Sequence, residues 1–325
     1  MPCKFSIIIA IRNEEDNIPS LIASLTKLNY STSNYEIIFV DDNSTDSSYK
    51  LISGLIMKYP NYKIIKTESH ALLHGKKAAL STGIAGASFP YILTTDADCI
   101  IGSNWLKVYS DKFNEGFDIL FGIAPFVLER FYVNHVAAFE NFRNSLLSFT
   151  LADCGLPYNA FGRNFGFKKD IFIKLNGYSE INKTLSGDDD LFLLLAAKYN
   201  YKIGTVKSKD AFVFSSTKKT FKQFLLQRSR HTKTSAIYPL RIKTILAFWH
   251  ILNIILTGSI LFVPFSNYFL IPFCSKMLID FATTIISQRK YGYRFNLLAI
   301  IPLQISYEVL IIVHFISSKI TKDKW

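Results

Sequence analysis

Two aspartates separated by one residue, Asp96 and Asp98, follow a short run of mostly apolar residues at positions 91–95. Such a run is typical of a buried strand, whose side chains alternate between two faces, so both aspartates are expected on one side and Ala97 on the other. No basic residue adjoins the pair in the sequence. The predicted partner is therefore Mg²⁺ or Mn²⁺, with positions left open for water and phosphate oxygens. A solvated turn after a strand is the alternative interpretation.

Two further acidic segments follow or precede apolar ones. Asp41 and Asp42 come directly after the apolar residues 36–40. Three consecutive acids at 188–190 precede Leu191 and the apolar residues after it. The positive end of a helix dipole would stabilise one or two of these three acids, which is the structural alternative to a chemical role.

The elements that must position these acids alternate between strands and helices. Strands are predicted at 5–11, 36–40, 62–66 and 91–95, and a small-residue helix at 75–87. Asn13 is expected to cap the first helix, whose apolar face contains residues 21, 22 and 25. This alternation predicts an α/β fold with a doubly wound, mostly parallel sheet. Ligands bind such sheets at the carboxyl ends of the strands, where the acids at 41, 42, 96 and 98 would gather.

Several other classes of protein lack support in the sequence. No glycine follows the first strand within residues 10–14, and the chain contains no G-x-x-x-x-G-K-[ST] motif. A dinucleotide-binding dehydrogenase is therefore disfavoured, and phosphate would be met by metal or basic side chains. The four cysteines form no C-x-x-C pair, which argues against a disulfide framework and structural zinc. Residues 1–10 do not resemble a signal peptide, so cytoplasmic thiols are expected.

Charge and hydropathy divide the chain near residue 244. Hydrophobic residues make up 49% of the chain, the formal net charge is +12, and the mean hydropathy is +0.20. The apolar excess lies mostly after Ile245, and residues 202–243 contain eleven Lys or Arg and a single acid. A basic run before an apolar segment predicts a cytoplasmic anchor on anionic lipid. No nucleic-acid motif accompanies the charge, so no nucleic-acid partner is predicted.

Three apolar segments after residue 244 are candidates to span a membrane, which takes about 20 residues. They are Ile245–Val263, Asn267–Ser287 and Asn296–Ser317. Lys276 and Asp280 interrupt the second, but four residues apart on a helix they can pair with each other. We expect three spans, with the basic loop 289–294 in the cytoplasm and the tail outside. If the middle segment lies in the interface instead, the tail at 319–324 would be inside.

Four motifs in order resemble the family 2 glycosyltransferases, which have the GT-A fold and use nucleotide-sugar donors. They are residues 6–14, 40–46, 75–80 and 95–98. Each motif alone is weak, but four in this order and spacing are specific. The resemblance covers about residues 5–242. It implies a GT-A domain at 1–243, followed by a membrane region at 244–325.

The resemblance implies roles for the acids and for several neighbours. Asp42 matches the residue that accepts the uracil N3–H, and Asp41 is its neighbour, with an Asx turn as the alternative. Asp96 and Asp98 match the ligands of the metal and the diphosphate. Positions assigned to donor binding also include Ala10, Asn13 and Lys76.

The acidic motif at 188–190 matches the family's catalytic base. Counting three residues back from Leu191 selects Asp188, whereas pairing the first two acids with the family's Glu-Asp selects Asp189. Both stay candidates. A base there would take a proton from the acceptor hydroxyl, and crowded carboxylates raise one another's pKa, which favours that role.

Two further segments resemble family motifs on the acceptor and diphosphate side. Residues 158–167 lie where the family has an acceptor-side segment, in which Arg163 and Asn164 are candidates against a simple turn. Gln227 and Arg230 match the family's Q-x-x-R-W motif, in which the arginine helps to hold the diphosphate. His231 replaces the tryptophan, which leaves open the acceptor type and whether transfer repeats.

These observations predict a membrane-anchored, metal-dependent, inverting glycosyltransferase in the multi-pass cell-membrane class, with its catalytic domain in the cytoplasm. The donor is a UDP- or GDP-sugar, and the acceptor is a lipid-linked sugar or a growing cell-envelope polysaccharide. One alternative is a catalytically silent homologue that serves as a membrane scaffold, to which only His231 points. The other is a metal-dependent phosphohydrolase that uses the same acids.

Overall fold

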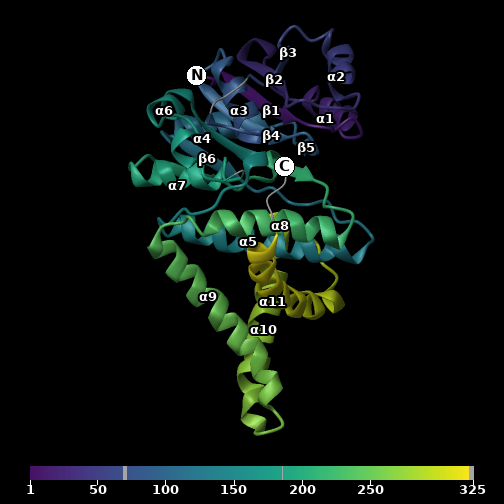
Figure 1. Ribbon diagram of the computed structural model, residues 1–325, viewed down its shortest axis with the longest axis vertical. Coiled ribbons are helices and arrows are strands. Elements are labelled where there is room, and N and C mark those ends of the chain that lie inside the picture. Colours follow the sequence, from purple (N-terminus) through teal and green to yellow (C-terminus); the bar gives the residue numbers. More distant parts are fainter. Residues whose placement is uncertain (69–71, 185, 322–325) are drawn as a thin grey trace. The chain divides into compact units, whose positions relative to one another are not determined.

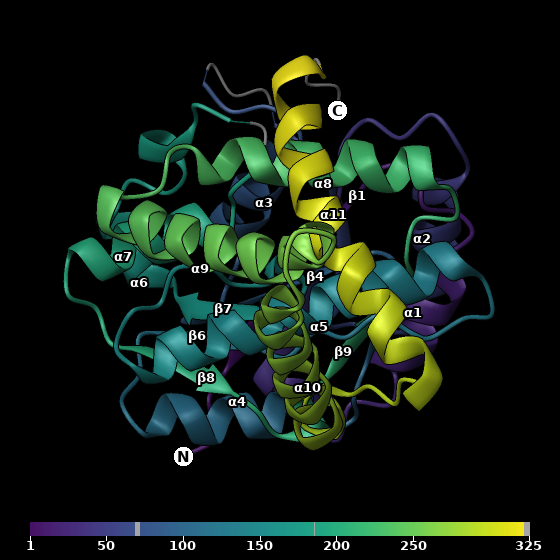
Figure 2. The same cartoon turned by 90° about the horizontal axis from the view of Figure 1, so that it is seen from below.

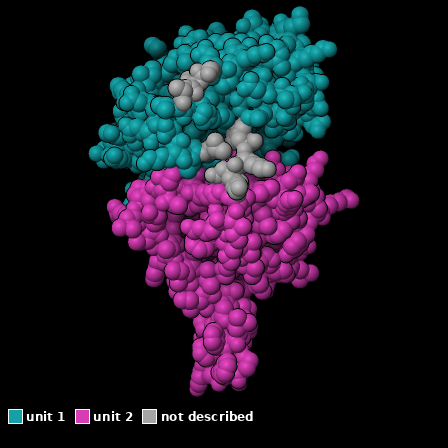
Figure 3. All heavy atoms as spheres, viewed as in Figure 1, with its two compact units in different colours: residues 1–125, 148–216, 325 teal, residues 126–147, 217–324 magenta. Residues whose placement is uncertain are grey.

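The computed structural model describes residues 1–68, 72–184 and 186–321 of the chain, which Figure 1 shows as a ribbon. These residues form two compact units, coloured separately in Figure 3. Of the described residues, unit 1 contains 1–125 and 148–216 with the gaps given above, and unit 2 contains 126–147 and 217–321. The division does not follow a single cut of the chain, and the domain boundary at 243 stays a prediction.

A seven-stranded sheet lies at the centre of the described part of unit 1, in the order β3-β2-β1-β4-β7-β6-β8 (Figure 1). The strands are β1 (Phe5–Ile11), β2 (Tyr35–Asp41), β3 (Tyr62–Lys66), β4 (Tyr91–Asp96), β6 (Ile119–Gly122), β7 (Phe165–Lys168) and β8 (Ile203–Val206). A separate antiparallel pair joins β5 (Cys99–Ile101) to β9 (Val213–Ser215).

The predicted mostly parallel sheet is confirmed. Strands β1 to β4 are mutually parallel, and β8 is parallel to β6. The β-branched run of β1 is almost wholly buried, as expected for a strand covered on both faces. Strand β7 was not predicted, and it runs antiparallel to both β4 and β6. A 22-residue helix, α5 (Tyr132–Asp153), lies between β6 and β7 in the chain, so no short crossover sets the direction of β7.

Helices cover both faces of the sheet in unit 1. The odd-numbered residues of β1 share one core with α1 (Ile18–Leu25), α2 (Ser48–Ile56) and α4 (Trp105–Asn114). On the other face, α3 (Lys76–Ala85) packs against β1 and β2, and α7 (Asp190–Lys198) places Phe192 against the rings of β7. A Cβ at Gly83 of α3 would lie 2.4 Å from Ile8 Cγ2, so glycine permits this close approach. The short α6 (Lys169–Lys174) follows β7.

The predicted cap at Asn13 is wrong. Helix α1 begins at Ile18, and Asn17 occupies the cap position. Asn13 has a φ of +55°, a conformation that asparagine tolerates better than most residues. Its side-chain oxygen instead accepts hydrogen bonds from the backbone N–H and the hydroxyl of Thr45, at 2.7 and 3.2 Å. Asn13 therefore joins the loop after β1 to the loop after β2.

The helices of unit 2 include the apolar segments predicted from the sequence. They are α8 (Phe221–Ser235), α9 (Leu240–Gly258), α10 (Leu270–Ser287) and α11 (Leu297–Ile320), together with residues 132–147 of α5. Within the unit, α9 packs against α10, and α8 packs against α11 (Figure 2). Within the part of the chain that the structure describes, three segments are long and apolar enough to cross a membrane: Leu240–Phe262, Asn267–Tyr291 and Leu297–Ile320. Residues 322–324 of the predicted tail lie outside the described residues.

A chain of buried ion pairs connects α5, α10 and α11 of unit 2. The predicted pair within α10 is confirmed, with Lys276 Nζ 2.8 Å from Asp280 Oδ2. Lys276 Nζ also lies 2.7 Å from Glu308 Oε1 on α11, and Arg143 Nη1 of α5 lies 3.0 Å from Asp280 Oδ1. Two cations and two anions thus balance, as buried charges require. Lys276 and Asp280, the charged residues that interrupt the apolar sequence of α10, therefore form contacts between the helices.

Candidate functional site

Predicted site residues lie at the carboxyl ends of β1, β2 and β4, which are at the same edge of the sheet. The parallel register sets Ala10 beside Asp96 and Ile11 beside Asp41. The backbone N–H of Asp42 then donates to the carbonyl of Ile11 at 2.8 Å, which holds the start of the next loop at the same edge. Strand order β2-β1-β4 thus brings together residues that are far apart in the sequence.

Lys76, the first residue of α3, joins two of the predicted acids. Its Nζ lies 2.7 Å from Asp96 Oδ1 and 3.2 Å from Asp188 Oδ2. Asp96 thus has a basic neighbour that its sequence context does not show. Burial alone would lower the pKa of Lys76, but the charges of Asp188 and Asp96 raise that pKa well above its usual value. Lys76 is therefore a fixed cation between these two carboxylates.

The two candidates for the base have different surroundings. Asp189 is the N-cap of α7, where its Oδ1 accepts the N–H of Asp190 at 2.8 Å. Its Oδ2 accepts the N–H of Gly162 at 2.6 Å, so backbone donors hold both oxygens. Asp188, by contrast, directs Oδ2 to the side chain of Lys76. Burial, followed by the nearby charges of Asp188 and Asp190, raises the pKa of Asp189 to about 8.

Gly162 is a close neighbour of both acids that the sequence did not identify. Its carbonyl accepts the hydroxyl of Thr94 at 2.6 Å, while its N–H donates to Asp189. A Cβ at this position would lie 3.2 Å from Asp189 Oδ2 and 3.3 Å from Asp188 Oδ2. A residue without a side chain is what lets the backbone approach both carboxylates.

Asp96 and Asp98 lie at the end of β4 largely as predicted. Asp96 is the last residue of the strand, and Ala97 and Asp98 form a turn before β5. Ala97 is buried, whereas both aspartates are partly exposed, so the expected alternation holds. Among the described residues, no three His, Cys, Asp or Glu side chains form a group able to hold a metal ion. Two carboxylates with substrate phosphates and water remain a suitable set for Mg²⁺ or Mn²⁺.

Asp41 and Asp42 are both buried at the end of β2, where each has a local partner. Asp41 Oδ1 lies 3.4 Å from the N–H of Ser44, the turn contact proposed as the alternative role of this acid. Asp42 Oδ2 lies 3.4 Å from Nη1 of Arg12, which follows β1 directly. Arg12 lies within the first motif, residues 6–14, but its pairing with Asp42 depends on the register of β1 and β2 and was not predicted.

Asn164 is a structural residue rather than an acceptor contact. It is fully buried, and its Oδ1 accepts from Trp105 Nε1 and Tyr109 OH at 2.8 Å each. Its Nδ2 donates to the carbonyls of Ile123 and Ala211 at 2.8 and 2.9 Å. With these partners, its amide has no donor or acceptor directed to solvent. The neighbouring Arg163 donates from Nη2 to the carbonyl of Ala124 at 2.6 Å.

Lys77, the second lysine of the pair that opens α3, has a role that the sequence did not show. Its side chain is buried, and its Nζ donates to the carbonyls of Ile181 and Thr184. Consecutive residues of a helix point in directions about 100° apart, because each turn takes 3.6 residues. The two lysines therefore contact different partners. The only sequence signal for a separate role of Lys77 is the pair of consecutive lysines at the start of the helix.

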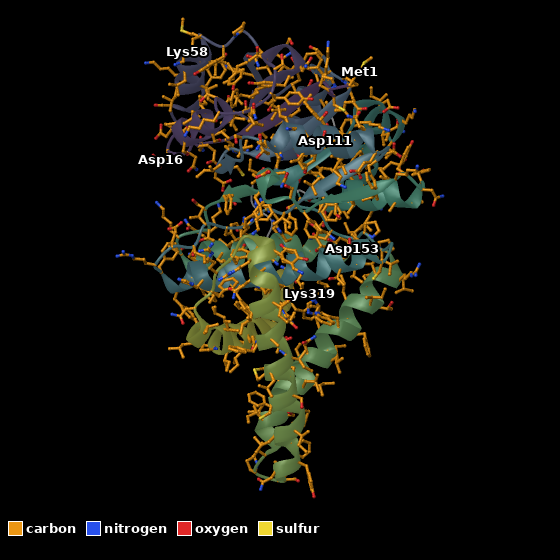
Figure 4. All side chains as sticks on the ribbon, turned by 180° about the vertical axis from the view of Figure 1, so that it is seen from behind. Met1, Asp16, Lys58, Asp111, Asp153 and Lys319 are labelled. Atoms are coloured by element: carbon orange, nitrogen blue, oxygen red, sulfur yellow. The ribbon has the colours of Figure 1, made fainter. Side chains whose placement is uncertain are left out.

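Gln227 and Arg230 lie on α8 in unit 2, one helical turn apart, and both are partly buried. His231 is exposed. Their roles toward a diphosphate stay predictions. Asp16, Lys58 and Asp111 are examples of charged residues of unit 1 that lie at its surface, away from the acids of the candidate site (Figure 4).

Comparisons with known proteins give the family of the chain. Residues 6–175, just over half of the chain, match the family described as glycosyl transferase family 2. An uncharacterised glycosyltransferase of Synechocystis is 36% identical over 122 residues, which are 37% of each chain. A β-monoglucosyldiacylglycerol synthase of Nostoc is 33% identical over 101 residues, 31% of this chain and 21% of the relative. The matched segments thus span well under half of these two relatives.

The backbone of one solved structure can be matched to nearly the whole of this chain. The mannosyltransferase PcManGT from Pyrobaculum calidifontis, in complex with GDP-Man and Mn²⁺, has a TM-score of 0.57 at 14% identity. The match covers 99% of this chain and 89% of that one, and at this identity it shows a shared fold. The mostly parallel sheet with its covering helices is accordingly the GT-A architecture. On the family match, the chain belongs to glycosyl transferase family 2.

Proposed function

We propose that the chain is a metal-dependent, inverting glycosyltransferase that uses a UDP- or GDP-sugar donor. The observation that carries this proposal is the contact of one ammonium group, that of Lys76, with both Asp96 and Asp188. The contact brings a candidate metal ligand and a candidate base together at the carboxyl edge of the sheet. Open α/β sheets bind their ligands at this edge.

The donor would lie along the ends of β1, β2 and β4. We assign Asp41 and Asp42, both buried at the end of β2, to the nucleoside, with Ala10 and Asn13 beside it. Lys76 supplies a positive charge for the diphosphate. Gln227 and Arg230 of α8 are assigned to the same diphosphate on the strength of the family motif.

Asp96 and Asp98 would hold Mg²⁺ or Mn²⁺. Their carboxylate oxygens suit a hard cation, and both side chains are partly exposed, so they are open to a ligand from solvent. When bound, such an ion neutralises charge on the diphosphate leaving group. PcManGT, which shares the fold, was solved with Mn²⁺ and GDP-Man, and this supports the assignment.

We assign Asp188 as the general base and Asp189 as its support. Two backbone N–H groups, those of Gly162 and Asp190, hold the oxygens of Asp189, whereas Asp188 contacts the side-chain ammonium of Lys76. Asp188 would accept the proton of the acceptor hydroxyl while that oxygen bonds to the anomeric carbon. The bond from the anomeric carbon to the phosphate oxygen breaks in the same step, so a single displacement inverts the anomeric centre.

The acceptor would be a lipid-linked sugar or a growing glycan at the cytoplasmic face of the cell membrane. Three helices long and apolar enough to cross a membrane support membrane association. A relative named as a β-monoglucosyldiacylglycerol synthase supports a lipid-linked acceptor. The basic residues at 202–243, directly before the first apolar helix, favour the cytoplasmic face.

The test is thermal stabilisation of the detergent-solubilised protein by UDP- and GDP-sugars, each with and without Mn²⁺. At least one donor should raise the Tm only when Mn²⁺ is present, because the cation screens the diphosphate from the acids. The double variant D96N/D98N should lose this rise, whereas D111N, an exposed aspartate of the same unit, should keep it. If no nucleotide stabilises the wild-type protein, the proposal is wrong. Acceptor-independent release of nucleotide would favour the phosphohydrolase.

A further inference from the structure

Lys77 is a buried lysine whose ammonium group contacts backbone carbonyls. The residue is 2% exposed, and Nζ lies 2.5 Å from the carbonyl oxygen of Ile181 and 3.0 Å from that of Thr184. A buried cation is unfavourable unless it is well coordinated. The buried ammonium group therefore needs its two carbonyl partners, and the segment that carries these carbonyls indicates the role of Lys77.

The segment held by Lys77 leads directly into the acids. Thr184 continues the connection, because its hydroxyl donates to the carbonyl of Ser186 at 2.7 Å. Gly187 follows with a φ of +91°, and Asp188 comes next. The positions of residues 181–184 and of Ser186 therefore determine where Asp188 lies.

The two lysines at the start of α3 hold this segment at both ends. Lys77 binds the backbone at 181 and 184, while Lys76 binds the carboxylate of Asp188. The lysines are adjacent on a helix that packs against β1 and β2, so their backbones are fixed relative to the sheet. Burial lowers the pKa of Lys77, and the negative charges of Asp188, Asp190 and Asp189 offset part of this shift.

We propose that Lys77 is a positioning residue for the transfer reaction. It holds residues 181–184 against the start of α3, so that Asp188 stays beside Lys76 at the carboxyl edge of β4. Lys77 itself touches no reacting atom. The inference rests on the proposed function only in naming Asp188 as the group that is positioned.

The first experiment measures amide hydrogen exchange in the full-length protein. K77M removes the ammonium at similar side-chain length, K77R restores a cation able to donate to both carbonyls, and K77Q is a neutral donor should K77M not fold. The matched control is K169M, because Lys169 also donates to a backbone carbonyl, that of Ala87, at 2.7 Å. We expect amides 181–184 to exchange at least tenfold faster in K77M, with β1 and β4 unchanged. K77R should restore much of the protection, and K169M should not affect this segment.

The second experiment separates positioning from binding. The Kd for UDP or GDP with Mn²⁺ should stay within about twofold in K77M, because the nucleotide contacts are elsewhere. Turnover of the sugar nucleotide that stabilises the wild-type protein should fall by a factor on the order of 100, the cost of misplacing a reacting group by about 1 Å. K77R should recover at least a tenth of wild-type turnover.

The outcomes test separately the positioning role of Lys77 and the proposed glycosyltransferase function. Unchanged exchange at 181–184 in K77M would overturn the inference, and so would an equal loss of turnover in K169M. A wild-type protein that binds no nucleotide would overturn the proposed function. The exchange measurement would then still test whether Lys77 holds the segment.

Discussion

At the scale of single residues, the site depends on one ammonium group among several carboxylates. Asp96, Asp188 and Asp189 would repel one another if no cation lay among them. Lys76 contacts the first two, and backbone N–H groups hold the third. Each of these three carboxylates is therefore held by a specific hydrogen-bond donor or cation. The different contacts of Asp188 and Asp189 are the basis of the separate tasks that we propose for them, which the sequence could not distinguish.

Asp188→Asn should abolish transfer while leaving donor binding in place. Asparagine keeps the size of the side chain but cannot accept the proton of the acceptor hydroxyl. Loss of a general base costs about 10²- to 10⁴-fold in rate. We expect turnover to fall by about 10³-fold, while Mn²⁺-dependent binding of UDP or GDP, measured by calorimetry, persists. Turnover close to wild type in D188N would return the role of base to Asp189.

The raised pKa of Asp189 predicts a change of stability with pH. Its pKa is about 8 in the folded chain and near 3.8 in an unfolded one. Between these values the folded protein keeps the proton that the unfolded chain loses, so this group makes the folded state less stable as pH rises. The Tm of wild type should therefore fall relative to that of D189N from pH 5 to pH 8.

The comparison with D189N removes other titrating groups from the measurement. Asparagine is also a good N-cap, so the cap of α7 should survive the change. A Tm difference between the two proteins that is the same at pH 5, 6.5 and 8 would contradict the prediction. D111N serves as a control, because Asp111 is exposed and should show no such trend.

At the scale of elements, helix starts and strand ends position the polar groups. Helix α3 begins with the two lysines, and α7 begins with the capped acid Asp189. In unit 2, the polar residues of α10 and α11 serve packing instead. Lys276 and Glu308 pair across the two helices, and Asp280 is shared between Lys276 and Arg143.

Lys276→Met should destabilise unit 2 strongly. It leaves the buried Glu308 without its cation, and breaking a buried pair from one side costs about 3–5 kcal/mol. The double variant K276M/E308L should recover most of this loss, because apolar partners of similar size replace both charges. The measurement is unfolding of the detergent-solubilised protein in SDS. The control is K319M, because Lys319 is exposed near the end of α11. A double variant no more stable than K276M would contradict the expectation.

At the scale of the whole molecule, the chain combines a GT-A unit with a unit that carries three apolar helices. Unit 2 also takes residues 126–147 from the middle of the chain, so the sequence order of the two units is interleaved. Aromatic side chains of this inserted segment, such as Phe139 and Phe142, pack against Phe295 in the same unit. These aromatic residues of α5 are therefore part of the core of unit 2.

Three spans predict the side of the membrane on which the chain ends. With the N-terminal unit in the cytoplasm, an odd number of crossings places the C-terminus outside. Alkaline phosphatase fused after residue 325 should therefore be active, whereas green fluorescent protein at that position should not fluoresce. The opposite result would mean two crossings, with the middle helix in the interface. The control is fusion after residue 239, before the first apolar helix, which should give the reverse pattern.

The sequence by itself determined the local elements and the family. The apolar run of β1 is typical of a strand buried on both faces, and β1 was predicted at its observed bounds. The shorter edge strand β3 was also predicted at its observed bounds. Acids directly after strands could be assigned to one sheet edge, because parallel strands end at the same side. The pair of Lys276 with Asp280 was predictable for a similar reason, since residues four apart on a helix are neighbours.

Only the tertiary structure decided which distant residues meet. Asp96 and Asp188 both contact the ammonium group of Lys76, and Asp189 accepts the N–H of Gly162. The side chain of Asn164 makes its hydrogen bonds within the core. None of these contacts follows from periodicity or composition, because each depends on strand order and on where long connections return. Local sequence restricts the conformation of a segment, whereas the burial of whole faces determines which segments become neighbours. For this reason the family and the fold class could be predicted from the sequence, but the contacts within the candidate site could not.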